Sequence, residues 1–160
     1  MMVARHSCKI LLRWAILVVV YQPFFIVNAQ YDTIDGHSCF RNLKGMTESM
    51  FDLASEYPNL SSVSVIGESY LKITNSNNDD YPLPQNGYDI YGMNITASDS
   101  LHQSSSKGKM LIISGVHPRE LAPPELVMRF AESLVDGYNV DSDITWLLQN
   151  TEIHFIFHVN

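Results

Sequence analysis

The chain has 160 residues, of which 46% are hydrophobic and 17% are charged. This length limits it to about one domain, and the apolar content excludes a wholly disordered or collagen-like chain. Acidic residues outnumber basic ones by 17 to 10, which gives a formal net charge of −7. Binding to nucleic acid requires a basic surface, so the charge argues against nucleic acid as a partner.

The first 29 residues have the three-part order of a secretory signal peptide. Three basic residues lie between positions 5 and 13, an apolar run follows from Trp14 to Val27, and small residues close the segment at Val27-Asn28-Ala29. Gln22-Pro23 interrupts the run, which leaves it short of the roughly 20 apolar residues that a membrane span needs. We therefore expect residues 1–29 to be removed after Ala29, and the remaining chain to be secreted with no membrane attachment.

Two further features bear on a secretory route. Asn59-Leu60-Ser61 and Asn94-Ile95-Thr96 are acceptor triplets for N-glycosylation. Removal of the signal peptide takes Cys8 with it and leaves Cys39 as the one cysteine of the remaining chain. Three interpretations of Cys39 stay open: a free buried thiol, a bond to another molecule, or a bond to a residue beyond this sequence.

The rest of the chain alternates between predicted strands and helices. Residues 30–39 are a polar lead-in, predicted as part of a loosely held segment over 30–42, and the domain proper is predicted over 40–160. A first helix is expected from an N-cap at Thr47 to a stop at Pro58, because apolar residues recur at helical spacing between them. Polar loops are expected over 74–87 and 98–108.

Further apolar segments complete the predicted fold. Strands are expected at Ser61–Gly67, Tyr88–Thr96, Met110–Val116 and Ile153–Val159, and helices from Pro124 to Gly137 and over Asp143–Gln149. The continuous run of the third strand predicts burial on both of its faces. This order predicts an α/β fold, an incomplete mixed sheet flanked by helices. The sequence stops at a strand in the middle of the sheet, so we expect a truncated domain, the alternative being a small natural domain that ends on an edge strand.

One motif carries chemistry, Gly115-Val116-His117-Pro118-Arg119-Glu120. It follows the predicted buried strand, at the end of a sheet where ligands collect in α/β folds. His117 and Glu120, three residues apart in a turn, can direct an imidazole nitrogen and a carboxylate to one zinc ion. A catalytic zinc has three protein ligands and a water, so this pair is an incomplete site. His-x-x-Glu alone arises by chance, and the strand before it and the helix after it give it specificity.

Three landmarks in chain order resemble the zinc metallocarboxypeptidases of the carboxypeptidase A and B type. After a first helix that ends near a proline, the chain contains Ile66-Gly67-Glu68-Ser69-Tyr70, then Gly115 to Glu120, and last a strand over Phe155 to Asn160. The final asparagine matches the start of the family's asparagine-proline-aspartate-glycine. The resemblance implies the amino-terminal half of that fold over residues 40–160.

The resemblance implies roles for individual residues. His117 and Glu120 would be zinc ligands, and Arg119 would contact the substrate. The family's third ligand, its carboxylate-clamping asparagine–arginine pair, its substrate-contacting tyrosine and its general-base glutamate have no counterpart in this sequence. No catalytic residue is therefore assigned within it. His154 and His158 precede the position where those residues would begin, so we interpret both as core histidines.

The implied activity is release of the last residue from peptides or proteins with a free C-terminus, by water activated on one zinc ion. The 160-residue chain itself is expected to bind zinc weakly and to be inactive. Two alternatives remain: a related zinc amidase or deacylase, and a secreted non-catalytic glycoprotein domain with the same fold. The Ile66-to-Tyr70 landmark favours the peptidase. Glu125 is interpreted as a helix-start charge, and Asp79-Asp80 as part of a solvated loop.

Overall fold

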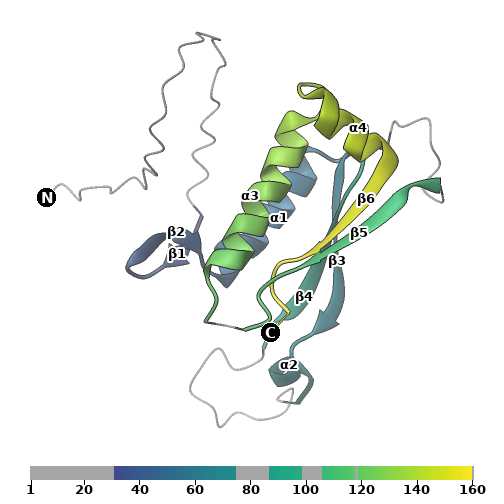
Figure 1. Cartoon of the computed structure of the whole chain (residues 1–160). Helices are drawn as coiled ribbons and strands as arrows, with labels where there is room; N and C mark the ends of the chain where they lie inside the picture. The colour runs from purple at the N-terminus through teal and green to yellow at the C-terminus, as the bar shows by residue number, and fades with distance from the viewer. Residues whose placement is uncertain (1–30, 75–86, 99–105, 118, 160) are drawn as a thin grey trace, which may run out of the picture.

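The molecule consists of a four-stranded sheet with three helices on one of its faces and a small hairpin beside them (Figure 1). The computed structural model describes residues 31–74, 87–98, 106–117 and 119–159. The predicted signal peptide and most of the two predicted polar loops lie outside these residues. Within the part of the chain described, no helix combines the length and the apolar character needed to cross a bilayer.

The sheet is mixed, with the strand order β3-β4-β6-β5. Its members are β3 (Ser61–Glu68), β4 (Asp89–Ile95), β5 (Gly108–Ile113) and β6 (Thr151–Ile156). β4 is antiparallel to both β3 and β6, whereas β5 and β6 are parallel. It follows that β3, β5 and β6 run in the same direction and end at the same edge of the sheet. The predicted mixed α/β fold is confirmed.

The main helices are α1 (Leu43–Glu56), α3 (Ala122–Gly137) and α4 (Ser142–Asn150), and a short α2 (Tyr70–Thr74) follows β3. The three main helices bury one apolar stripe each against the same sheet face. Side chains that alternate along β4 and β6 form the other half of this core, namely Met93, Ile95, Ile153 and Phe155. The alternation of the strands and the 3.6-residue period of the helices therefore meet in one hydrophobic core.

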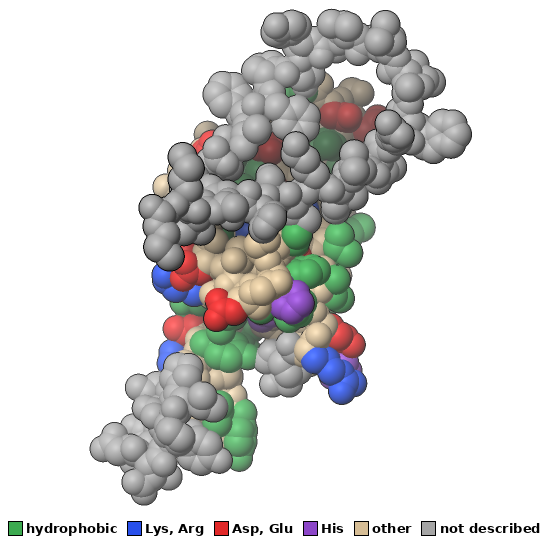
Figure 2. Space-filling model, turned by 90° about the vertical axis from the view of Figure 1, so that its left-hand side faces the viewer, with side chains coloured by type: hydrophobic (Ala, Val, Ile, Leu, Met, Phe, Trp, Pro, Cys, Tyr) green, Lys and Arg blue, Asp and Glu red, His purple; other side chains and the backbone are tan. Residues whose placement is uncertain are grey.

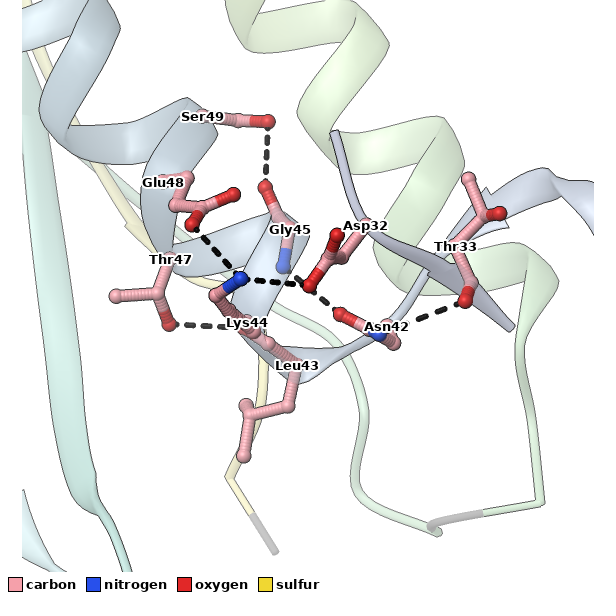
Figure 3. Close-up of polar contacts among 9 residues, drawn as sticks. All are labelled: Asp32, Thr33, Asn42, Leu43, Lys44, Gly45, Thr47, Glu48 and Ser49. Atoms are coloured by element: carbon pink, nitrogen blue, oxygen red, sulfur yellow. Dashed lines mark hydrogen bonds and ion pairs between the residues drawn. The ribbon is translucent and has the colours of Figure 1, made fainter. Parts of the chain in front are cut away.

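The start of α1 differs from the prediction. The N-cap is Asn42, whose side-chain oxygen accepts a hydrogen bond from the Gly45 amide at 2.9 Å (Figure 3). Thr47, the predicted cap, lies inside the helix, where its hydroxyl donates to the Leu43 carbonyl. The prediction was wrong because Asn42 has a second partner that periodicity does not reveal: its amide donates to the carbonyl of Thr33, in the preceding hairpin.

The predicted loose lead-in is a hairpin of β1 (Thr33–Ile34) and β2 (His37–Arg41). It packs closely on the first turn of α1, because a Cβ placed on Gly45 would lie 2.1 Å from the carbonyl oxygen of Asp32. Asp32 also pairs with Lys44 at 2.7 Å (Figure 3). The hairpin is therefore fixed by contacts between segments, which a scan for local periodicity does not detect.

β5 contradicts the prediction of a strand buried on both faces. It is an edge strand, and Met110, Leu111 and Ile113 are each about half exposed. Ile112 is the residue of β5 that packs against the core. The apolar run predicted the strand correctly but not its position in the sheet, since a run of apolar residues does not say how many neighbours a strand has.

The surface agrees with the acidic composition. On the face shown in Figure 2, the Lys and Arg side chains of the described residues lie in small separate groups among acidic and apolar side chains.

Candidate functional site

The candidate site lies at the edge of the sheet where β5 and β6 end. Ile113 and Ile156 are the last paired residues of these parallel strands. The chain then leaves β5 through residues 114–121 and enters α3. In Figure 1 this loop lies beside the end of β6 and the carboxyl end of the chain. The sheet therefore places the predicted motif at the edge where α/β folds bind ligands.

The structure places His117, Arg119 and Glu120 together in one exposed turn. The Glu120 amide donates to the His117 carbonyl at 3.0 Å, which closes the turn between the two predicted ligands. An imidazole and a carboxylate are donors that zinc accepts, and both are accessible here. Among the residues that the structure describes, no group of three or more His, Cys, Asp or Glu side chains could hold a metal. The donors present thus fit part of a zinc site.

The other two histidines near this edge have different surroundings. His154 lies on β6, where its Nε2 is 3.6 Å from a carboxylate oxygen of Glu152. His158 follows the end of β6, and burial lowers the pKa of its imidazole. The Nε2 atom of His158 is buried without a hydrogen-bond partner. Neither histidine joins His117 in a metal-binding group within the described residues.

Glu125, interpreted from the sequence as a helix-start charge, has a larger role. It lies in the first turn of α3, where it is buried, and it interacts with two arginines, Arg41 and Arg129. Its carboxylate receives the backbone amide of Arg41 at 3.1 Å and the guanidinium of Arg129 at 2.9 Å. The Arg41 side chain also lies 3.6 Å from Glu125 and contacts Glu132. This group of charges joins β2 to the helix that follows the candidate site.

The two predicted glycosylation sites have contrasting environments. Asn59 lies exposed in the turn between α1 and β3. Asn94 lies within β4, an inner strand, and its Oδ1 atom is buried. Its side chain lines a groove of about 270 Å³ on the sheet face away from the helices.

Cys39 lies half-buried on β2 and takes part in a disulfide bond. The three interpretations of Cys39 concern the chain after removal of residues 1–29, and they stay predictions.

Comparison with known protein families identifies the family of this chain. The sequence profile of the zinc carboxypeptidases matches residues 46–160. The chain belongs to the zinc carboxypeptidase family. A comparison with curated protein sequences gives no significant match. The resemblance inferred from the three sequence landmarks is thus confirmed at the level of the family.

Solved structures of carboxypeptidases share the fold. Thrombin-activatable fibrinolysis inhibitor aligns with a TM-score of 0.59 at 20% identity, over 75% of this chain and 25% of its own. Carboxypeptidase A from Helicoverpa armigera aligns with a TM-score of 0.58 at 21% identity, over 76% of this chain and 24% of its own. Bovine thrombin-activatable fibrinolysis inhibitor, solved in complex with tick carboxypeptidase inhibitor, aligns with a TM-score of 0.54 at 20% identity. The alignment covers 76% of this chain and 31% of that one. The chain thus spans about a quarter of the length of the first two of these structures.

Two contributors to this region were missed by sequence reasoning. Arg41 gave no signal, because its partners are 84 and 91 residues away in the chain. Ser114 was passed over as part of an apolar run, although it is buried and its hydroxyl binds the end of β6. A polar residue within an apolar run is a weak signal that could have drawn attention to Ser114.

Proposed function

We propose that this chain is the amino-terminal part of a secreted zinc carboxypeptidase that removes C-terminal residues from peptides. The observation that carries the proposal is the exposed turn that holds His117 and Glu120 at the ligand-binding edge of a zinc carboxypeptidase fold. His117 and Glu120 would hold one zinc ion through nitrogen and oxygen. Bound zinc would supply Lewis-acid polarisation of the scissile carbonyl. Arg119, exposed in the same turn, would bind substrate oxygen atoms with its guanidinium.

The two donors leave the proposed site incomplete within this chain. A catalytic zinc needs a third protein ligand, and proton transfer during peptide hydrolysis needs a general base. The matched carboxypeptidases are about four times as long as the part that aligns with this chain, since it covers 25% and 24% of them. We therefore assign the third ligand and the base to sequence beyond residue 160, and expect the 160-residue chain to be inactive alone.

The test is hydrolysis by the complete protein. The transcript would be read beyond codon 160, and the complete protein expressed and assayed with a peptide that has a free C-terminus and with its C-terminal amide. We expect zinc-dependent release of the last residue from the free peptide alone, because the carboxylate-clamping asparagine–arginine pair of the family, which we expect beyond residue 160, requires a free carboxylate. The 160-residue chain, as the matched control, should release nothing.

Three outcomes would contradict this proposal. Hydrolysis of N-acyl amino acids without cleavage of peptides would identify the amidase or deacylase alternative. A complete protein that cleaves neither substrate would identify a non-catalytic domain. Peptide cleavage by the 160-residue chain, abolished by His117→Ala, would show that the base and third ligand lie within it.

If the protein is secreted, the structure leads to a separate prediction of which acceptor triplet is glycosylated. In a eukaryotic secretory host, Asn59→Gln is expected to remove one glycan, because Asn59 is exposed in a turn. Asn94→Gln is expected to leave the glycan content unchanged, because the Asn94 side chain is held within an inner strand. The mass before and after deglycosylation would be measured for each variant. If Asn94→Gln lost the glycan and Asn59→Gln kept it, the assignment of Asn59 as the glycosylated residue would be contradicted.

A further inference from the structure

The base of the loop that carries His117 is joined to the end of β6. The Ser114 amide donates to the Ile156 carbonyl at 2.9 Å, which continues the β5–β6 ladder by one residue. The Ser114 hydroxyl donates to the next carbonyl, that of Phe157, also at 2.9 Å. The Val159 amide then donates to the Gly115 carbonyl at 3.3 Å. A side chain thus extends the strand pairing at the point where the backbone of β5 stops.

Gly115 turns the chain away from the sheet directly after this contact. Its φ of +61° lies in the left-handed region, which glycine adopts without steric cost. The space beside it is also filled, because a Cβ would lie 2.5 Å from the Phe157 carbonyl oxygen and 2.9 Å from His158 Nδ1. The end of β6 therefore defines where the loop leaves the sheet. His117 follows two residues later.

The turn beyond this base is exposed, unlike Ser114 itself. Ser114 is 5% exposed, whereas His117, Arg119 and Glu120 all lie on the surface. A short exposed turn takes its direction from the buried residues at its base. Metal sites depend on such support, since ligand directions must hold within a fraction of an ångström, and loss of an outer partner costs about 10–100-fold in affinity.

We propose that Ser114 is a positioning residue of the metal site, which fixes the direction of the His117–Glu120 turn by binding the Phe157 carbonyl. This inference rests on the proposed function, because it takes His117 and Glu120 as the metal ligands. Ser114 acts through the backbone, and neither contacts the metal nor takes part in the reaction. The end of β6 thereby belongs to the support of the site, although its own side chains are not ligands.

The test compares Ser114→Ala with a matched control, Ser61→Ala, in the complete protein. Ser61 is 6% exposed, and its hydroxyl also donates to a backbone carbonyl at 2.9 Å, that of Leu53 in α1. Two quantities would be measured. The first is zinc affinity, by competition with a chelator. The second is hydrogen exchange in the metal-free protein, over the segment of residues 114–121. In Ser114→Ala we expect zinc affinity to fall about tenfold and exchange in this peptide to accelerate. Ser61→Ala should change neither quantity, even if it lowers the midpoint of urea-induced unfolding as much as Ser114→Ala does.

Each other outcome overturns a defined part of the reasoning. Unchanged exchange over residues 114–121 in Ser114→Ala would show that the hydroxyl does not hold the turn. Faster exchange with wild-type zinc affinity, or an equal loss of affinity in Ser61→Ala, would show that it does not position the metal ligands. A wild-type protein that retains no zinc would instead overturn the proposed function, and with it the positioning role.

Discussion

Replacing Arg41 with methionine is expected to destabilise the folded chain by about 1–3 kcal/mol. The Arg41 side chain is 12% exposed and lies between two carboxylates, Glu125 and Glu132, of which the first is 6% exposed. Methionine keeps much of the apolar stem but removes the positive charge. Glu132 would then lose its positively charged partner, whereas Glu125 would keep Arg129 and the backbone amide of residue 41. A partly buried carboxylate that has lost its cation destabilises the folded state. Urea-induced unfolding of the two proteins would measure the difference.

Arg129→Met provides the matched control, because Arg129 is the same residue type and shares the partner Glu125. The Arg129 side chain is 58% exposed, and its pair with Glu125 spans one helical turn at 2.9 Å. Exposed pairs of this kind contribute about 0.2–1 kcal/mol, since water screens the charges. The two variants should therefore differ several-fold in their effect. Equal losses would show that burial does not set the strength of these pairs, and would contradict the interpretation of Arg41.

A pH series separates charge from packing in the Arg41 result. Burial raises the pKa of Glu132, and the positive charge of Arg41 opposes this rise. Arg41 therefore stabilises the ionised form of Glu132, and this contribution is lost as the pH falls through the folded-state pKa. The difference in unfolding free energy between wild type and Arg41→Met should shrink from pH 7 to about pH 4. A difference independent of pH would assign the effect to packing alone.

The parts of the fold that depend on local periodicity were predicted from the sequence. The apolar stripe of α3, its end at Gly137 and the alternation in β3 and β4 all correspond to observed elements. The same holds for α4 and β6, whose bounds differ from the predicted ones by up to three residues. In α3, β4, α4 and β6 one face of the element packs into a single core, so consecutive residues show the pattern of burial. β3 is more exposed, and Val65 is 54% exposed.

The errors all involve contacts between distant segments. The hairpin of β1 and β2 is too short to show a period, and it is held by Arg41 and by its contact with α1. The N-cap of α1 was misplaced because Asn42 is selected partly by a partner in β1. β5 was predicted to be buried on both faces, but in the described part of the chain it lies at the edge of the sheet, and Met110, Leu111 and Ile113 are about half exposed. Tertiary position overrides local preference in all three.

In the candidate site, too, features set by neighbouring residues were predicted from the sequence, and features set by distant contacts were missed. The motif from Gly115 to Glu120 was found because its two proposed ligands are three residues apart and follow a strand, and both features can be read from the local sequence. The support of the site was missed, because Ser114 and the Phe157 carbonyl are 43 residues apart. Ligands close in sequence can be recognised as a motif, whereas the residues that orient them are brought together only by the fold.

His117→Ala is expected to remove zinc from the complete protein while leaving it folded. The loss of one of three protein ligands opens a catalytic zinc site, so metal content should fall from about one ion per chain to none. The His117 side chain is exposed and lies outside the core, so the thermal midpoint of the metal-free protein should not change. Elemental analysis after dialysis would measure the zinc, and His37→Ala, an exposed histidine on β2, is the control. Zinc retained at one ion per chain in His117→Ala would contradict the assignment of this ligand.

Glu120→Gln tests whether the second donor binds the same ion. The substitution keeps the size of the side chain and leaves in place the backbone bond from the residue 120 amide to the His117 carbonyl, but it removes the negative charge. An amide oxygen is a poorer ligand for zinc than a carboxylate, so zinc content should fall here as well. Loss of zinc in both variants, with the fold intact, would place the two side chains on one ion. Loss in His117→Ala alone would instead leave His117 with a different partner, and the turn would then present a single ligand.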